Sequence, residues 1–399
     1  MAARRQHGAL DEGAKTAAAS VHRRAAQVID EQRQKIFAHV AAAVEGRDPE
    51  GVHDMRVATR RLRACLKVFG PWLDPTDLER LEPAIRTMTR ALGTVRELDV
   101  LRLRCAELAA HAAPQRALAI ECVDARLARR RRRARARMLA RFAKVDLDRL
   151  EGRLRRLTTQ LAREASTIAP DEPSSACTPA DDTTSTPPAI PANGTGNSAE
   201  DQPIAALLES LAPAVLDEAR EVCLPTLPDE VGTPRAAEAL HAVRIAAKKL
   251  RYTLEIVAPY LGEGGGVAVR QLRAVQDKLG EFHDDTVLDD TLRPEVDHAL
   301  ERDRPLLAAE LRALRTARRR TLLRDERAVR GAIAKLREND FVGALAAALM
   351  AAGIALPPPP SEPAAEREDV AAAVLPPTRG RRAREQARSA AAANVPGTD

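Results

Sequence analysis

Apolar and polar residues follow a helical period in the stretch VHDMRVATRRLRACLKVF, from Val52 to Phe69. At 3.6 residues per turn, one face is mostly apolar and can pack on a core; it carries Val52, Met55, Thr59, Leu62, Leu66 and Phe69. The opposite face carries a basic row at steps of three and four residues, made of His53, Arg56, Arg60, Arg63 and Lys67. The row is predicted to extend for about 21 Å. Asp54 is the only acid in this helix and is expected to point away from the row.

The same pattern occurs a second time in the stretch LHAVRIAAKKLRYTLEIV, residues 240–257. His241 lies 188 residues after His53, and the cationic positions follow in register as Arg244, Lys248, Lys249 and Arg251. They correspond to Arg56, Arg60, Arg61 and Arg63 of the first copy. The apolar face repeats as well, as Leu240, Val243, Ala247, Leu250, Leu254 and Val257. A second copy that keeps this register predicts an internally duplicated fold.

Helical periodicity continues on both sides of the two basic stretches. In the first half it predicts helices at 15–45, 78–92, 95–112 and 115–164, with Gly93 ending the second of these or marking a tight contact. In the second half it predicts helices at 203–223, 234–258, 267–280, 283–300 and 302–336. The interpretation is an all-α fold of two pseudo-symmetric antiparallel helical bundles, each with one copy of the repeat.

The two bundles are separated by a segment rich in Pro, Ser, Thr and Asp, which has almost nothing to bury. The expected organisation is a flexible N-terminus at 1–14, a first bundle at 15–165, a disordered linker at 166–203, a second bundle at 204–350 and a disordered tail at 357–399. The acids of the linker would compete weakly for the basic rows, or the linker would serve only as a tether.

Composition supports helices, because 45% of the residues are hydrophobic but only 2% are aromatic. Lys and Arg number 63 against 57 Asp and Glu, so the net charge of +6 says less about partners than the segregation of charge does. Five cysteines without a C-x-x-C pair indicate reduced thiols in the cytoplasm. The N-terminus has no apolar signal segment, and the apolar run 341–356 is shorter than the ~20 residues that span a bilayer. We therefore expect a cytoplasmic protein without a membrane partner.

The doubled pattern H-x-x-R-[VI]-x-x-[RK]-[RK]-L-R resembles the CHAD family, the conserved-histidine α-helical domain. A second motif of that family is also recognisable, as LGTVRELDVL at 92–101 and LGEFHDDTVL at 279–288. Glu97 stands where Asp is usual, and His283 stands where Asn is usual in the second copy. The resemblance covers about residues 15–165 and 203–350. It implies two similar four-helix bundles that face each other across a basic surface, inorganic polyphosphate as the ligand, and association with polyphosphate granules.

A linear polyanion needs cations repeated along a line, and Arg binds phosphate through its planar fork whereas Lys supplies a point charge. The candidate polyphosphate-binding residues in the two rows are His53, Arg56, Arg60, Arg61, Arg63, Lys67, His241, Arg244, Lys248, Lys249 and Arg251. An arginine-rich helix adds Arg126, Arg130, Arg133 and Arg137 on one face. For the run Arg129–Arg133 of this helix, taken alone, an ordinary solvated face is an equally good explanation.

The two histidines have two interpretations. Neighbouring cations should lower the pKa of His53 and His241, so that each is neutral and donates one hydrogen bond to a phosphate oxygen. Alternatively, each caps the start of its helix or satisfies a core contact. The residues alone leave both open, and the resemblance favours ligand contact.

The sequence offers little for catalysis or for a metal. It contains no G-K-[ST] phosphate loop, no nucleophile elbow and no H-E-x-x-H, so we expect no catalytic residues and no cofactor. The cluster His283, Asp284 and Asp285 could hold Mg²⁺ or Ca²⁺, but acids after a helix break more often stabilise the next helix N-terminus, and no metal is expected.

Two other functions stay open. A basic helical surface also attracts nucleic acid, although this chain lacks the aromatic platform of single-strand binders, and its rows lack the Asn or Gln that reads adenine. Nonspecific duplex binding is therefore the main alternative. A helical scaffold with no polyanion ligand is the third possibility, but it leaves the missing acids of the rows unexplained.

Overall fold

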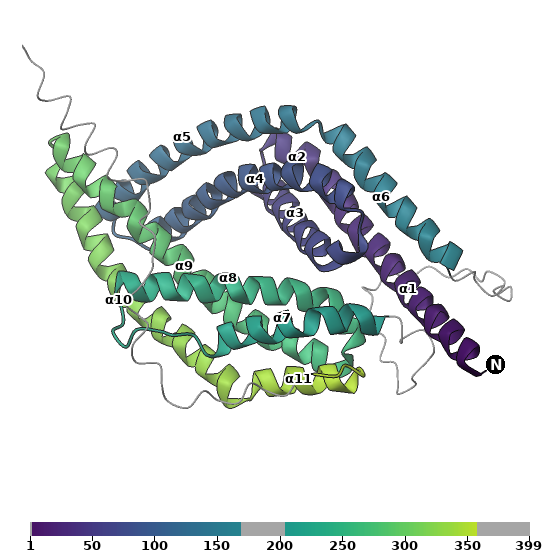
Figure 1. The fold of residues 1–399 in the computed structure, drawn as a ribbon. Helices are drawn as coiled ribbons and strands as arrows, with labels where there is room; N and C mark the ends of the chain where they lie inside the picture. The colour runs from purple at the N-terminus through teal and green to yellow at the C-terminus, as the bar shows by residue number, and fades with distance from the viewer. Residues whose placement is uncertain (1, 169–203, 357–399) are drawn as a thin grey trace, which may run out of the picture. The chain divides into compact units, whose positions relative to one another are not determined.

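The computed structural model describes residues 2–168 and 204–356, which lie in one compact unit that ends at Leu356. The first half contains α1 (Ala2–Ala38), α2 (Val40–Glu45), α3 (Pro49–Phe69), α4 (Pro75–Ala110), α5 (Pro114–Val145) and α6 (Leu147–Ile168) (Figure 1). The second half contains α7 (Ala205–Cys223), α8 (Pro234–Val257), α9 (Gly262–Glu301), α10 (Pro305–Glu338) and α11 (Phe341–Ala351). No strand occurs in the described ranges, so the predicted all-α class is confirmed. The linker and the tail predicted at 166–203 and 357–399 lie almost entirely outside them.

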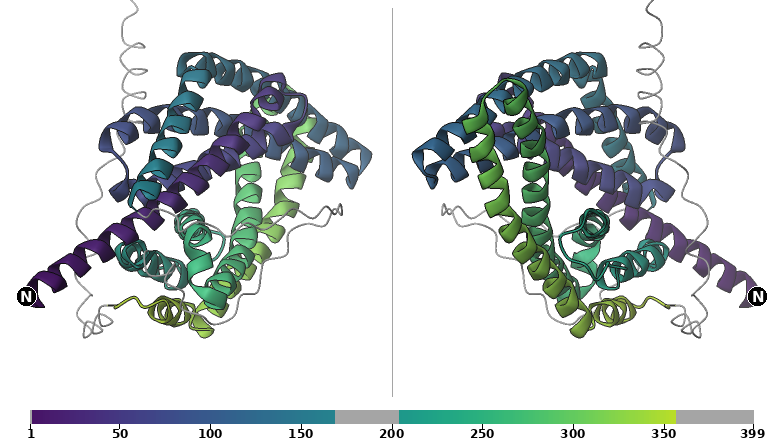
Figure 2. Two further views of the ribbon diagram at one scale, coloured as in Figure 1. Left: turned by 90° about the vertical axis from the view of Figure 1, so that its right-hand side faces the viewer. Right: turned by 90° about the vertical axis from the view of Figure 1, so that its left-hand side faces the viewer.

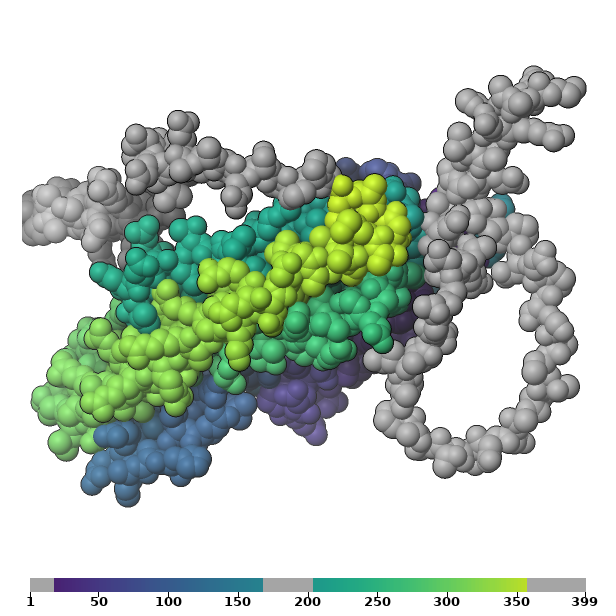
Figure 3. Space-filling model, turned by 90° about the horizontal axis from the view of Figure 1, so that it is seen from below, coloured from purple at the N-terminus to yellow at the C-terminus, as the bar shows by residue number. Residues whose placement is uncertain are grey.

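The two halves repeat one order of helices, which confirms the predicted pair of pseudo-symmetric bundles. In the first half α3 packs between α1 and α4, α5 returns along α4, and α6 packs on α1. In the second half α8 packs between α7 and α9, α10 returns along α9, and α11 packs on α7. Figure 2 shows α9 and α10 as a long antiparallel pair, and Figure 3 shows α10 and α11 covering one face of the second half.

The two basic stretches form α3 and α8, and both helices start and end in the same way. Asp48 caps α3 by accepting a hydrogen bond from the backbone N–H of Glu50 at 2.9 Å, and Thr233 caps α8 through the N–H of Ala236 at 3.1 Å. A proline follows each cap, at the position where its missing N–H costs nothing. Each helix then closes in a short 3₁₀ turn that contains proline, at Gly70–Trp72 and at Ala258–Tyr260.

The predicted apolar faces of α3 and α8 are buried, as their spacing requires. Every one of the twelve positions is at most 3% exposed; they are Val52, Met55, Thr59, Leu62, Leu66, Phe69, Leu240, Val243, Ala247, Leu250, Leu254 and Val257. Burial of this stripe turns the basic row of each helix away from the core of its own half.

Several predicted helix ends are wrong. Gly93 does not end a helix, because α4 runs without interruption from Pro75 to Ala110, and α9 likewise spans the two helices predicted at 267–280 and 283–300. The long helix predicted at 115–164 breaks at Asp146, whose φ of 53° is left-handed, and becomes α5 and α6. The first predicted helix starts at Ala2 and not at residue 15, and it breaks at His39.

An ion pair fastens the two helices of each long hairpin, with opposite polarity in the two halves. Arg102 of α4 donates to Asp124 of α5 at 2.8 and 3.0 Å, whereas Arg315 of α10 donates to Asp289 of α9 at 3.0 and 2.9 Å. The two pairs occupy equivalent places, since Asp124 and Arg315 each lie ten residues after the proline that starts their helix. The duplicated fold therefore keeps the pair and inverts its charges.

Candidate functional site

The two basic rows meet where α3 of the first half packs against α8 of the second (Figure 1). Arg60 is close enough to Arg56, Arg244 and Lys248 that its charge lowers the pKa of all three. We call these four side chains, Arg56, Arg60, Arg244 and Lys248, the central cluster. It brings together Arg56 with Arg244 and Arg60 with Lys248, two pairs that are each 188 residues apart in the chain and that the repeat places at equivalent positions.

No member of the central cluster has an ion-pair partner in the described part of the chain. Arg56 makes one long hydrogen bond, 3.4 Å, to the carbonyl oxygen of Thr89, and the guanidinium of Arg60 lies 5.5 Å from the ring centre of Tyr252. Arg244 and Lys248 form neither a hydrogen bond nor an ion pair within 18–167 and 204–356, and Nε of Arg244 is buried without a partner. Four half-buried cations thus lie together with nothing to neutralise them directly.

Burial and mutual repulsion disfavour the charged forms of the side chains in the central cluster. Burial, followed by Arg244, Arg60 and Arg56, lowers the pKa of Lys248 to about 7, and burial is also the first cause of the lowered pKa of Arg56 and of Arg244. An anion that enters the cluster would reverse this field and favour the charged forms.

Two carboxylates partly offset this lowering of the pKa values. The charge of Glu97 of α4 acts in this way on Arg56, and the charge of Asp284 of α9 acts on both Arg244 and Lys248. Burial in turn raises the pKa of Asp284 itself. Glu97 and Asp284 occupy equivalent positions in the two copies of the L-G motif. An acid that recurs at one motif position is a signal in the sequence from which both residues could have been predicted to lie at the site.

The histidines of the rows flank the central cluster and do not cap their helices. The caps are Asp48 and Thr233, so the capping alternative is wrong. The pKa of His53 is lowered by burial and then by Arg96, and that of His241 by burial and then by Arg244. The expected direction is confirmed, although burial outweighs the neighbouring charges as its cause.

In the second half the histidine has an aromatic neighbour. Nδ1 of His241 lies 3.4 Å from Nδ1 of His283, and the two ring centres are 4.9 Å apart. Burial, Arg244 and His241 lower the pKa of His283 to about 4, so this ring is neutral near pH 7. The equivalent motif position in the first half is Arg96. The structure thus adds His283 to the residues around the site.

The C-terminal parts of the two rows already have acids as ion-pair partners. Glu255 of α8 lies 3.4 Å from Arg61 of α3 and 2.8 Å from Arg251, and Glu218 of α7 lies 3.9 Å from Lys67. Arg61 and Lys67 therefore join the two halves through ion pairs, whereas Arg251 pairs with an acid of its own helix. Arg63 and Lys249 are exposed, and the guanidinium of Arg63 has Arg86 and Arg90 as cationic neighbours.

The candidate arginines of α5 also include one that is paired with an acid and three that are not. Arg126 pairs with Glu295 of α9, across the two halves. Arg130, Arg133 and Arg137 are exposed and have no hydrogen bond or ion pair within the described ranges, and nothing joins them to the central cluster. Of the sequence candidates, the structure thus brings Arg56, Arg60, Arg244 and Lys248 together, with His53 and His241 beside them.

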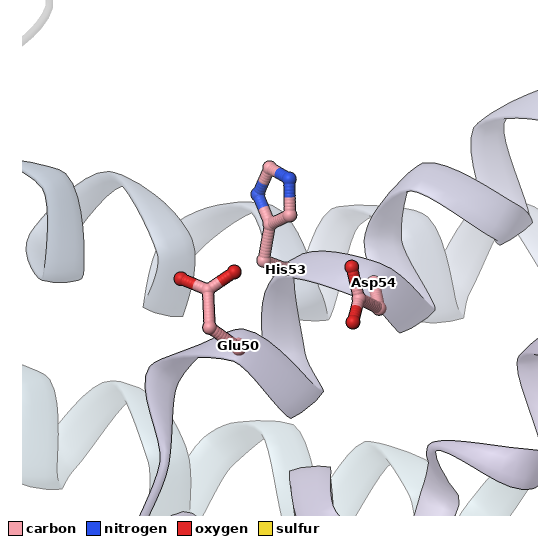
Figure 4. A group of neighbouring side chains, drawn as sticks. All are labelled: Glu50, His53 and Asp54. Carbon is pink, nitrogen blue, oxygen red and sulfur yellow. The ribbon is translucent and has the colours of Figure 1, made fainter.

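The acidic cluster considered for a metal has other partners. Asp285 is buried and forms an ion pair with Arg318 at 2.6 Å, so it is not free to hold a cation. A different group, Glu50, His53 and Asp54, has ligand atoms within 4.8 Å of one another (Figure 4). Its two carboxylates have basic neighbours, since Glu50 lies 3.6 Å from Arg96 and Asp54 lies 3.9 Å from His39. The arrangement is explained without a metal.

In the described residues, no helix combines the length and the apolar character that crossing a bilayer requires.

Comparison with known proteins identifies the family. The family model of the CHAD domain matches residues 27–293. The crystal structure of the CHAD domain from the plant Ricinus communis is 20% identical, covers 78% of this chain and 91% of its own, and superposes with a TM-score of 0.52. PptA from Streptomyces chartreusis is 17% identical over 79% of this chain and 99% of its own, with a TM-score of 0.49. No curated protein matches the chain. With two thirds of its length matched by the family model, the chain belongs to the CHAD family.

Proposed function

We propose that the central cluster binds inorganic polyphosphate, and that both halves contribute to one site. The observation that carries the proposal is the meeting of four cations from α3 and α8 without an ion-pair partner in the described residues. Keeping them together costs free energy through burial and repulsion, and a polyanion offsets this cost by placing negative charge between them. Membership in the CHAD family points to the same ligand.

The surroundings of the cluster favour a bare phosphate chain over nucleic acid. Tyr252 is a partly buried aromatic ring beside the cluster, and the guanidinium groups of Arg60 and Arg251 lie 5.5 and 5.0 Å from its centre. These two cations already contact the ring and compete with a base that would stack on it. Glu97 and Asp284 carry negative charge beside the cluster and therefore repel an anionic ligand. A densely charged polymer gains the most attraction from the four cations, so it overcomes this repulsion best.

The test removes one cation from each half. Arg56→Gln and Arg244→Gln should each weaken binding of long-chain polyphosphate by about tenfold or more, because a charge-assisted contact contributes about 1.5–3 kcal/mol. The measurement is a binding titration at fixed ionic strength, with duplex DNA and RNA at the same phosphate concentration as competitors.

Arg302→Gln and Arg304→Gln serve as the control, because these exposed arginines carry the same charge and their side chains have no partner in the described residues. Equal affinity in the wild type and in the Arg56/Arg244 double variant would contradict the proposal. A larger loss for DNA than for polyphosphate would support nucleic-acid binding instead. By the same proposal, a fluorescent fusion associates with polyphosphate granules in the cytoplasm, and the double variant should leave them.

A further inference from the structure

A second arginine row lies on α6, away from the two basic stretches. It consists of Arg149, Arg153, Arg156 and Arg163, with Gln160 completing steps of four, three, four and three residues. This is the helical spacing of a single face, and the row extends for about 21 Å. The apolar face of α6 is buried, mostly against α1, and carries Leu150, Leu154, Leu157, Leu161 and Ala165. The arginines therefore point outward, and all but the half-buried Arg153 are exposed.

The row borders a groove between α6 and the first turns of α4. This groove has a volume of about 440 Å³ and is lined by Arg80, Arg149, Arg153, Arg156, Asp77, Leu157 and Gln160. Four guanidinium groups thus face one carboxylate. Arg153 donates one long hydrogen bond, 3.4 Å, to the carbonyl oxygen of Arg80. Of the other three guanidinium groups, none has a hydrogen bond or an ion pair in the described part of the chain.

No acid of α6 forms an ion pair with this row in the described residues. Glu151 accepts from Arg33 of α1 at 2.7 Å, Glu164 lies 3.4 Å from His22 of α1 and accepts from Gln160 at 2.9 Å, and Asp148 is exposed. The duplicated architecture does not require the row either, since the equivalent helix of the second half, α11, contains no charged residue. The arginines of α6 are therefore an addition to one half, and no partner within the described structure explains them.

We propose that the arginine-lined groove between α4 and α6 is a second binding site for polyphosphate, which holds a stretch of chain outside the central cluster. The inference rests on the proposed function. Guanidinium forks bind phosphate oxygens in pairs, and Gln160, whose amide donates to Glu164 at 2.9 Å, is the neutral member of the row between Arg156 and Arg163. The row continues past the groove to Arg163, so it fits an extended polymer rather than a single phosphate group. No aromatic side chain lines the groove, which disfavours a stacked nucleic-acid base.

A second site makes affinity depend on chain length. A polyphosphate chain long enough to reach both sites binds the second one intramolecularly and gains avidity, whereas tripolyphosphate occupies one site at a time. The groove should therefore matter for long chains and should matter little for the affinity that the central cluster has for a short chain.

The experiment compares Arg149→Gln/Arg153→Gln/Arg156→Gln with a control triple, Arg302→Gln/Arg304→Gln/Arg327→Gln, which removes three exposed arginines from the second half. We expect the groove triple to lose about tenfold or more in affinity for long-chain polyphosphate, and less than about twofold for tripolyphosphate. The control triple should lose little for either ligand. A Lys triple at the groove positions keeps the charge and should recover part of the loss; far-UV circular dichroism checks that each variant is folded.

The outcomes separate the groove from the central cluster. Wild-type affinity for long chains in the groove triple, or a loss equal to that of the control triple, overturns the second site and leaves the proposed function intact. A loss in the groove triple with none in the Arg56/Arg244 variant supports the groove and contradicts the central cluster. Weaker binding of duplex DNA without weaker binding of polyphosphate would make the groove a nucleic-acid surface and would overturn the proposal.

Discussion

Among single residues, Lys248 is the most sensitive reporter of the central cluster. Burial and three neighbouring arginines hold its pKa at about 7, and Asp284 opposes them only in part. In the free protein this lysine therefore loses its proton near neutral pH, more than three pH units below the ordinary value of 10.5. An arginine at the same place would stay charged at any pH of interest. Because this position holds a lysine and not an arginine, the charge of the central cluster changes with pH near neutrality.

Polyphosphate binding should weaken as the pH rises above about 7. A bound polyanion raises the pKa of Lys248, so the complex takes up a proton between the free and the bound pKa, and affinity falls as the pH rises through that window. In the free protein, burial is the main cause that lowers the pKa values of the neighbouring histidines, His53, His241 and His283, from their ordinary value, so that they lie below this window. Titrations at about pH 6 and about pH 9 with a long chain, at constant ionic strength, measure the effect.

Lys248→Arg is the matched control, because it keeps the cation but removes its titration. It should bind with nearly equal affinity at both pH values, and Lys248→Met should bind weakly at both. The same pH dependence in the wild type and in Lys248→Arg would rule out this lysine as the source.

At the residue level, sequence reasoning identified the cations but not their partners. The period of the row is a local property, so the spacing alone places His53, Arg56 and Arg60 on one face of a helix. The ion pair between Arg61 and Glu255 joins residues almost two hundred positions apart, and no local pattern predicts it. For the same reason, the sequence could not separate the free cations of the central cluster from the neutralised ones.

Among the helices, α4 shows how one glycine positions a functional side chain. Gly93 lies inside the helix and is buried, and a Cβ atom there would come within 2.7 Å of Nη1 of Arg56. The missing side chain leaves the space in which the guanidinium of Arg56 lies. Gly280 is the equivalent residue in α9, and a Cβ atom there would meet nothing within 4 Å.

The substitutions Gly93→Ala and Gly280→Ala should therefore differ. Alanine is favoured over glycine in a helix interior by about 1 kcal/mol, so Gly280→Ala should raise the unfolding free energy and leave polyphosphate binding unchanged. Gly93→Ala should displace the end of Arg56 and weaken binding by about threefold to tenfold, since less than one charge-assisted contact is lost. Chemical denaturation and a binding titration measure the two effects. Loss of affinity in both variants, or in neither, would contradict this role of Gly93.

The same glycine explains why helix ends were harder to predict than helices. A glycine after a leucine-rich stretch is a common stop signal, but its cost of about 1 kcal/mol is easily exceeded by packing along a helix such as α4. Conversely, the break at Asp146 has no glycine or proline to announce it, and it follows from the turn that lets α6 fold back onto α1. Periodicity established the helices and their buried faces; tertiary packing decided where they stop.

In the whole molecule, like charges meet at the centre of the junction between the halves, and opposite charges meet around it. The central cluster pushes α3 and α8 apart. Ion pairs hold the halves together elsewhere, between Arg126 and Glu295 and, at 3.2 Å, between Arg116 and Glu310. A polyanion in the central cluster should therefore strengthen the junction as well as occupy it.

These two ion pairs should contribute unequally to stability. The side chains of Arg126 and Glu295 are 20% and 15% exposed, so Glu295→Gln leaves a largely buried cation unpaired and should lower the unfolding free energy by about 1–3 kcal/mol. Arg116 and Glu310 are about one third exposed, and Glu310→Gln should cost less than about 1 kcal/mol. Chemical denaturation of the two variants gives the comparison, and equal losses would show that burial does not distinguish the pairs.

The inverted ion pairs of the two hairpins have a consequence for folding. Because the halves share one architecture, a newly made chain could dock α5 on α9, or α10 on α4, instead of on the proper neighbour. The first mistake would bring Asp124 against Asp289, and the second would bring Arg102 against Arg315. Each places like charges together in a partly buried position, where repulsion is strong. The inverted charges thus disfavour pairing of a hairpin helix with the wrong half, although the two halves share one architecture.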